Sequence, residues 1–258
     1  MLVHGLGGRW QHYEPASLEL AEHVRVLAVD LPGFGLSALP GQPMSLDEHV
    51  DAVADVCRDA GVEQLILAGH SMGGPLAMRF AQRHPGWASA LVLVCGTVQT
   101  FQQTLAGRIR PWLRAPRTAT ATVAELALTS VTVPRALHGL LARNLTLRRL
   151  ILWPFVDQSS ALPTPYAAAL IGGSGARGSL PTARALARIT GWERPEYDLP
   201  PTYAINGARD RIAPLSDLRR FPVPFERATV LPAGHMVMLE SRQGFARELI
   251  RITRDTWA

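Results

Sequence analysis

The stretch Gln64-Leu65-Ile66-Leu67-Ala68-Gly69-His70-Ser71-Met72-Gly73-Gly74 decides the fold. Its first five residues are apolar after Gln64 and predict a buried strand, and a helical pattern follows to about His84. Between strand and helix lies the pattern Gly-x-Ser-x-Gly, centred on Ser71. A turn sharp enough to expose a side chain there needs small flanking residues, which the glycines supply. We therefore expect Ser71 to be a nucleophile at the end of a buried strand.

A serine hydroxyl is a weak nucleophile at neutral pH and needs a base, usually a histidine oriented by a carboxylate. Both follow in the sequence: Asp210 comes after the predicted strand ending at Asn206, and His235 comes after the last predicted strand. The chain order Ser, Asp, His is the one expected for this kind of turn. Parallel strands place their sites at the carboxyl ends, so we predict that Ser71, Asp210 and His235 form a catalytic triad.

Such a triad needs two N–H groups to hold the oxyanion that forms on the substrate. The residue after the nucleophile, Met72, is expected to supply one of them. The loop His4-Gly5-Leu6-Gly7-Gly8 is expected to supply the other, from Leu6 or from the neighbouring Gly7.

Strand-like and helix-like segments alternate around this stretch, which predicts βαβ units and a parallel sheet. The alternation stops over roughly residues 97–195, where the pattern is helical and interrupted by Pro and Gly. We therefore divide the chain into a core domain, residues 1–96 and 196–258, and a helical insertion, residues 97–195, which follows the strand ending near Cys95.

Five short motifs in this order resemble the landmarks of the α/β-hydrolase fold family. They are His4-Gly5-Leu6-Gly7-Gly8, Asp30-Leu31-Pro32-Gly33-Phe34-Gly35-Leu36-Ser37, Gly69-His70-Ser71-Met72-Gly73-Gly74, Asn206-Gly207-Ala208-Arg209-Asp210 and Gly234-His235. The resemblance implies an α/β fold with a mostly parallel central sheet flanked by helices. It also implies a capped serine hydrolase without a cofactor, in which the insertion is the cap. The fold hosts many reactions, so the resemblance says little about the substrate.

Several aromatic side chains of the insertion are candidates for lining a substrate pocket, although packing the cap onto the core explains them equally well. They are Trp112, Trp153, Phe155 and Trp192. Met236 follows His235 directly and is a further candidate.

The chain departs from the family at its start. Family members carry two strands before the His-Gly loop, and these N-terminal strands are missing here. Either the sequence starts late or the sheet lacks its antiparallel edge. A missing edge would expose a strand that needs covering, for which a homodimer is one solution.

All 26 basic residues are arginine, because the sequence contains no lysine. Schiff-base chemistry and a lysine general base are therefore excluded. Two cysteines cannot form a four-thiolate zinc site, and no spacing of the eight histidines suggests metal ligands, so we expect no metal.

The net charge of +5 is unevenly distributed. Residues 1–96 hold 5 Arg and 10 acids, net −5, while residues 97–195 hold 12 Arg and 3 acids, net +9. A solvated helical surface explains most of these arginines. A second interpretation is that the cap meets an anionic or carrier-bound acyl substrate, since the guanidinium group binds carboxylates and phosphates in a bidentate manner. No nucleic-acid motif accompanies the charge.

No apolar run reaches the ~18 residues of a membrane span, and no signal peptide is visible at the start. We therefore expect a cytoplasmic protein without a membrane partner.

The function predicted from these residues is hydrolysis of a carboxylic ester or thioester, or of a carbon–carbon bond, through an acyl-enzyme. Ring-cleavage hydrolases of the family carry Trp after the catalytic His, and Met236 departs from that pattern. Elimination, cyclisation or acyl transfer in the same pocket is the alternative. A non-catalytic binding module on the same scaffold is a third hypothesis.

Overall fold

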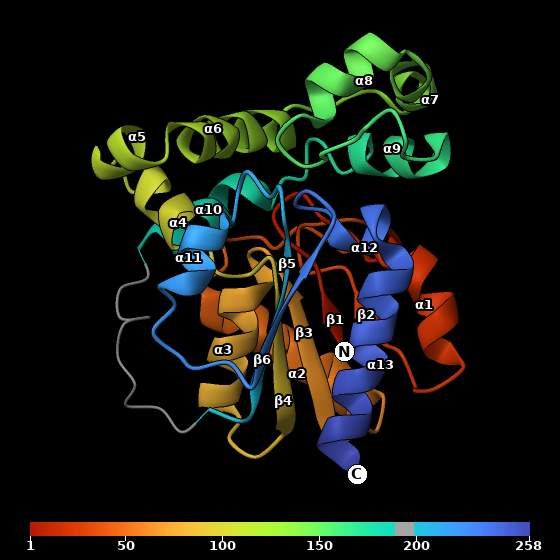
Figure 1. Ribbon diagram of the computed structural model, residues 1–258, viewed down its shortest axis with the longest axis vertical. Helices are drawn as coiled ribbons and strands as arrows, with labels where there is room; N and C mark the ends of the chain where they lie inside the picture. The colour runs from red at the N-terminus through yellow and green to blue at the C-terminus, as the bar shows by residue number, and fades with distance from the viewer. Residues whose placement is uncertain (189–198) are drawn as a thin grey trace.

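The computed structural model describes residues 1–188 and 199–258. Its centre is a six-stranded sheet in the order β2-β1-β3-β4-β5-β6, and every pair of neighbouring strands is parallel (Figure 1). The strands are β1 (Leu2–Val3), β2 (Ala28–Val29), β3 (Leu65–His70), β4 (Ala88–Val94), β5 (Thr202–Gly207) and β6 (Arg227–Leu231). The predicted α/β fold with a parallel sheet is therefore confirmed.

The central strands β3, β4 and β5 are almost entirely buried, as their largely apolar sequences predict. The sequence pattern over residues 24–30 predicts a longer strand than the structure has, which is only Ala28–Val29. Among the described strands β2 pairs only with β1. Because β1 comprises two residues, it cannot support a longer strand beside it.

Helices cover both faces of the sheet. On one face the first helix packs against the last, and on the other the helix after β2 packs against the helix after β3 (Figure 1). These helices are α1 (Glu14–Ala21), α13 (Arg242–Trp257), α2 (Leu46–Asp59) and α3 (Gly73–Arg83). Ser45 with Glu48 three residues later predicts a capping box, and α2 begins with one: each side chain accepts a hydrogen bond from the other residue's backbone N–H.

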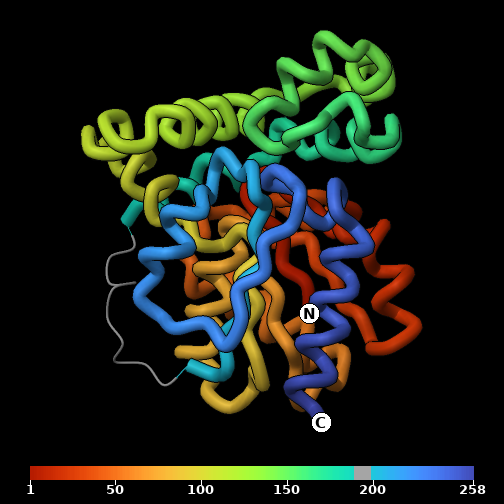
Figure 2. Tube along the Cα trace, in the orientation of Figure 1, coloured from red at the N-terminus to blue at the C-terminus, as the bar shows by residue number. Residues whose placement is uncertain are grey.

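After β4 the chain leaves the core, passes through a layer of helices over the carboxyl ends of the strands, and returns at β5 (Figure 2). The helices of this layer are α4 (Gln99–Leu105), α5 (Arg110–Arg114), α6 (Pro116–Ser130), α7 (Arg135–Arg143), α8 (Leu145–Leu152), α9 (Thr164–Ile171) and α10 (Ser179–Ala187). We refer to the described residues 97–188 as the cap. Its lower helices, α4 and α10, contact the core most directly, while α7 and α8 lie farthest from the sheet (Figure 1).

Three short helices complete the core: η1 (Trp10–His12), α11 (Leu215–Arg219) and α12 (Val237–Glu240). They follow the strand ends that face the cap, and so they help to shape the space between the two layers. Over the residues that the structure describes, no helix is both long and apolar enough to cross a membrane.

Candidate active site

Ser71 occupies the turn between β3 and α3. Its φ angle is 51°, in the left-handed region that costs an ordinary residue about 1–3 kcal/mol. The turn is held on both sides, because the Ser71 N–H donates to the carbonyl of Val94 (2.9 Å) and its carbonyl accepts from the N–H of Gly74 (2.8 Å). Strain of this kind persists only where the surrounding structure imposes it.

The glycines beside Ser71 are required by close packing. A Cβ atom on Gly69 would lie 1.9 Å from the carbonyl oxygen of Gly73, and one on Gly73 would lie 2.6 Å from the carbonyl oxygen of Val3. Both contacts are with backbone atoms, which cannot move aside as a side chain can. The small residues that the motif predicts are therefore needed to bring β3, α3 and β1 together.

Asp210 and His235 form a buried hydrogen-bonded pair. The Nδ1 atom of His235 lies 2.9 Å from Oδ2 and 3.1 Å from Oδ1 of Asp210. Oδ1 also accepts from the backbone N–H groups of Ile212 (2.8 Å) and Ala213 (2.9 Å), so the carboxylate is held in place from two sides. With Nδ1–H donated to the carboxylate, Nε2 of His235 is left as the basic atom.

The electrostatics of this pair favour a protonated imidazole. Burial would lower the pKa of His235, but the charge of Asp210 and its hydrogen bond outweigh burial and raise that pKa above its ordinary value of 6.5. Nε2 is buried and has no hydrogen-bond partner among the described residues. It is therefore free to exchange a proton with a group that enters the site.

Ser71 and His235 line the same cavity, which has a volume of about 100 Å³ and lies between the core and the cap. Of the other predicted site residues, Leu6, Gly7, Phe155 and Met236 also line it. Asp210 lies behind His235, and Met72 begins α3 directly after Ser71.

The tryptophan candidates are not brought into this cavity. Trp112 lies on α5 with 42% of its surface exposed, and Trp153 lies beneath the guanidinium of Arg211, 5.7 Å from it. Neither is among the lining residues. Trp192 lies outside the described residues.

One backbone donor, on Met72, follows Ser71 directly, and another, on Leu6, belongs to the loop that lines the same cavity. Leu6 and Met72 are 5% and 1% exposed, and the structure records no hydrogen bond for either N–H within residues 1–188 and 199–258. Buried N–H groups are nearly always paired, so two open ones near Ser71 can donate hydrogen bonds to an anionic oxygen.

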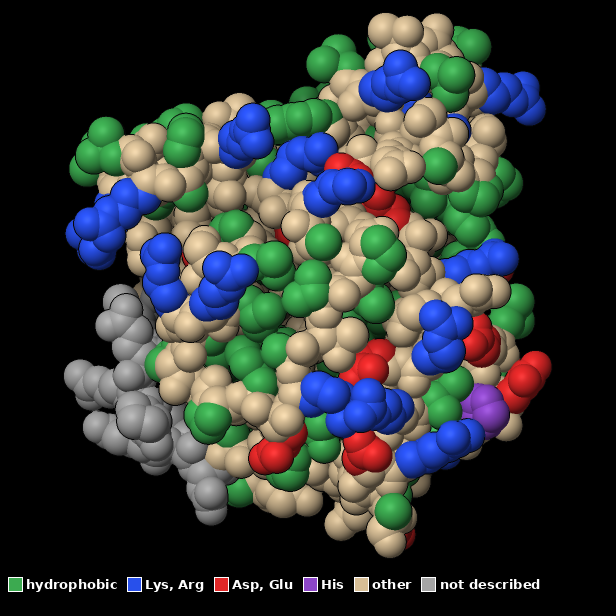
Figure 3. All heavy atoms as spheres, in the orientation of Figure 1, with side chains coloured by type: hydrophobic (Ala, Val, Ile, Leu, Met, Phe, Trp, Pro, Cys, Tyr) green, Lys and Arg blue, Asp and Glu red, His purple; other side chains and the backbone are tan. Residues whose placement is uncertain are grey.

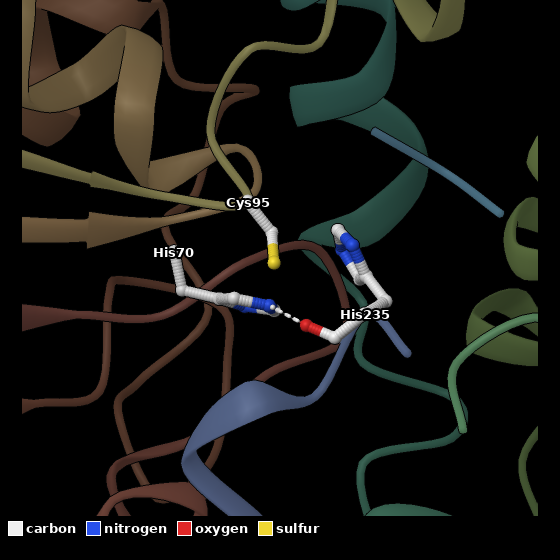
Figure 4. Close-up of side chains that lie close together, drawn as sticks. All are labelled: His70, Cys95 and His235. Carbon is white, nitrogen blue, oxygen red and sulfur yellow. Dashed lines mark hydrogen bonds between the residues drawn. The ribbon is translucent and has the colours of Figure 1, made fainter. Parts of the chain in front are cut away.

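Two further side chains, His70 and Cys95, lie beside the His235 imidazole, and the sequence does not indicate Cys95 there. Donor atoms of His70, Cys95 and His235 lie within 4.8 Å of one another, close enough to hold a metal ion (Figure 4). Nε2 of His70 instead donates to the carbonyl of His235 (3.0 Å), and burial raises the pKa of the Cys95 thiol, which also lies beside Asp210. We interpret this cluster as packing that fixes the His235 loop.

The cap is bonded directly to the loop that carries His235. The N–H groups of His235 and Met236 both donate to the carbonyl of Phe155, at 2.8 and 3.1 Å. Glu240 accepts from the N–H groups of Asp157 (2.8 Å) and Gly234 (2.8 Å), one in the cap and one beside the histidine. The position of the His235 loop therefore depends on the cap.

Sequence analysis missed several cavity residues, above all Glu125 on α6 and His12 on η1. Glu125 gives a detectable signal, because it stands alone on the buried face of a helix whose other buried residues are Ala and Thr. The glycine-rich stretch after α9 predicts a hinge or surface loop, but its residues Gly173 and Ser174 also line the cavity.

The arginines of the cap lie on its outer surface. Figure 3 shows basic and hydrophobic side chains interspersed over this layer. Among the described cap residues every arginine but Arg148 is exposed, and no arginine lines the cavity.

A larger depression of about 880 Å³ lies near the opposite ends of the strands, bordered by Leu27, Gln64 and Trp257. It contains none of the predicted site residues, and so it does not compete with the cavity at Ser71 as the reaction site.

Residues 1–248 match a family model described as the alpha/beta hydrolase family. The chain is 28% identical over 258 residues to the dihydrolipoyllysine-residue acetyltransferase component of the acetoin cleaving system of Pseudomonas putida, covering 98% of this chain and 63% of that protein. It is 37% identical over 108 residues to 2-hydroxymuconate semialdehyde hydrolase of Pseudomonas sp. strain CF600, covering 40% of this chain and 38% of that protein. The chain thus spans less than two thirds of the length of both curated relatives.

Solved structures resemble the whole fold. An esterase from Thermogutta terrifontis superposes with a TM-score of 0.74 at 19% identity, covering 99% of this chain and 89% of that one. A meta-cleavage product hydrolase from Pseudomonas fluorescens gives 0.69 at 20% identity, covering 98% and 89%.

Proposed function

Because the chain belongs to the alpha/beta hydrolase family, we propose that it is a serine hydrolase that cleaves a carboxylic ester or thioester through an acyl-enzyme on Ser71. The observation that carries the proposal is the buried His235–Asp210 pair beside the cavity. Nε2 of His235 has no hydrogen-bond partner among the described residues, and His235 lines the same cavity as Ser71, whose backbone is strained. A histidine held in one tautomer beside a serine activates that serine for acyl transfer.

In the first half of the proposed reaction, Ser71 Oγ attacks the acyl carbon while His235 Nε2 takes the hydroxyl proton. The carbonyl oxygen becomes an oxyanion, and the N–H groups of Met72 and Leu6 bind it. When the tetrahedral intermediate collapses, the bond to the leaving group breaks and His235 returns the proton to that group. Ser71 then carries the acyl group as an ester.

In the second half, water attacks the acyl-enzyme while His235 takes one of its protons. The oxyanion forms again at the same donors, the Ser71 ester bond breaks, and the proton passes back to Ser71. The products are the carboxylic acid and the free enzyme. Asp210 holds the imidazole in the required tautomer in both halves and stabilises its charged form.

The cavity favours a short, uncharged acyl group. Its walls are mostly aliphatic, with Leu128, Ile151, Leu152 and Leu170 among them, and its volume is about 100 Å³. The exposed cap arginines can contact only the part of a substrate that remains outside. An anionic or carrier-bound leaving group therefore stays a prediction, and it would contact the outer surface of the cap. The acyl group that enters the cavity is that of a small molecule.

Acyl transfer is the second candidate, because the relative that covers 98% of this chain is named as an acetyltransferase component. The same acyl-enzyme would then be resolved by a nucleophile other than water. Cleavage of a carbon–carbon bond is a variant favoured by the relative named 2-hydroxymuconate semialdehyde hydrolase.

Hydrolysis of p-nitrophenyl acetate and p-nitrophenyl butanoate tests the proposal. We expect turnover by the native chain and a loss of at least about 10⁴-fold in S71A and in H235A. Turnover that survives in S71A but still requires His235 would replace the acyl-enzyme with general-base chemistry. No turnover of any ester would favour the binding-module hypothesis.

A further inference from the structure

One ionisable group in the catalytic cavity has no part in the triad. Glu125 lies on α6, only 1% exposed, and its side chain lines the cavity with Ser71 and His235. Its carboxyl oxygen Oε2 is fully buried and has no hydrogen-bond partner among the described residues. Buried polar groups without a partner are rare because they are costly, so an unpartnered carboxyl facing a cavity indicates a ligand.

The helix that carries Glu125 is seated directly on the predicted oxyanion loop. One turn after Glu125, Thr129 packs so closely on Gly7 that a Cβ there would lie 2.3 Å from its Cγ2. The carbonyl of Thr129 also accepts from the N–H of Gly175 (2.8 Å), which ties α6 to the loop after α9. Glu125 is therefore fixed over the reacting groups by packing on either side of the cavity.

The surroundings keep this carboxyl neutral. Burial raises the pKa of Glu125 to about 8, while His235 lowers it and Asp210 raises it by smaller amounts. The other titratable groups on the cavity wall are His12 and His70, and burial lowers the pKa of each far enough to keep it uncharged. No arginine of the described residues lines the cavity to hold a carboxylate there.

We propose that Glu125 is a specificity-determining residue that donates a hydrogen bond to a second oxygen on the acyl chain, so that the preferred substrates are oxo-acyl esters or thioesters. The inference rests on the proposed hydrolase function. A neutral carboxylic acid offers one O–H donor, and the aliphatic walls offer few competing partners. An ammonium group would enter the same site at a much larger desolvation cost, so a neutral oxygen acceptor fits better than an amine.

The test compares p-nitrophenyl pentanoate with its 3-oxo and 4-oxo derivatives in the native chain and in E125Q, E125L and E22Q. In E125Q the side chain keeps a hydrogen-bond donor at every pH, and in E125L the donor is removed at similar volume. E22Q is the control, because Glu22 is an exposed glutamate of the core domain. We expect the better oxo ester to exceed the plain ester in kcat/KM by about tenfold in the native chain, in E22Q and in E125Q. In E125L the ratio falls to about one.

The pH dependence separates donation from simple packing. In the native chain the preference for the oxo ester decreases as pH rises through about 8, because the ionised carboxyl of Glu125 has no proton to donate. In E125Q the preference is independent of pH. A structural role for Glu125 predicts instead that E125Q and E125L lower the melting temperature without changing the ratio.

An unchanged ratio in E125L, or no preference for either oxo ester in the native chain, would overturn the assignment of Glu125. Failure of the proposed hydrolase function gives a different result. Plain p-nitrophenyl pentanoate would then not be hydrolysed, or S71A would hydrolyse it as fast as the native chain.

Discussion

Nδ1 of His235 and Oδ2 of Asp210 lie 2.9 Å apart, with the two side chains 1% and 0% exposed. The two residues follow neighbouring parallel strands, β5 and β6, whose ends are in register at Gly207 and Leu231. The sheet therefore brings together two groups that are 25 residues apart in the chain, in a place where water competes little for their hydrogen bond.

This pair predicts a pH profile. The raised pKa of His235 means that kcat/KM falls as the pH is lowered through a value above 6.5, since the protonated imidazole cannot accept the Ser71 proton. In D210N the inflection moves to lower pH, because the stabilising charge is lost, and kcat falls by roughly 10⁴-fold. Initial rates between about pH 5 and pH 9 measure both effects. An unchanged inflection in D210N would contradict the pairing.

The turn at Ser71 predicts a difference between two Gly→Ala substitutions. G69A places a Cβ 1.9 Å from a backbone oxygen, so we expect a loss of at least about 1–3 kcal/mol in unfolding free energy and a large loss of activity. Gly41 has no atom within 4 Å of its Cβ position, so G41A should change stability by less than about 1 kcal/mol and leave activity intact. Denaturant melts and ester turnover measure the contrast; equal effects of both substitutions would count against the packing argument.

Glu240 links the cap to the loop that carries His235. It accepts hydrogen bonds from Asp157, Gln158 and Gly234, so E240A leaves three backbone donors without their partner. We expect about 1–3 kcal/mol lower unfolding free energy and a reduced kcat, because the loop before His235 is released. E22A, at an exposed position, is the matched control. A normal kcat in E240A would show that the loop is held without it.

The core could be predicted because its signals are local. The buried run before Ser71, the capping box at Ser45 and the closing helix Arg242–Trp257 each lie within a short stretch, and the structure has all three. The closeness of Asp210 to His235 could be predicted because each residue follows a strand, and the carboxyl ends of parallel strands lie at the same edge of the sheet.

The helical insertion could be predicted, but its contacts could not, because they join segments with no shared period. Phe155 could not be told from Trp153 by sequence, yet the carbonyl of Phe155 holds His235 and Trp153 lies under Arg211. The role of Glu125 could not be predicted from its own stretch of sequence, because it depends on which groups lie opposite α6. The catalytic role of Ser71, the oxyanion donors and the homodimer stay predictions.

Labelling with a fluorophosphonate tests the central claim most directly, because the probe reacts with a serine only where a base and oxyanion donors activate it. Intact-protein and peptide mass spectrometry should show one adduct, located at Ser71, with none in S71A and much slower formation in H235A. No adduct on the native chain, an adduct at another residue, or equal labelling of H235A would contradict the proposed mechanism.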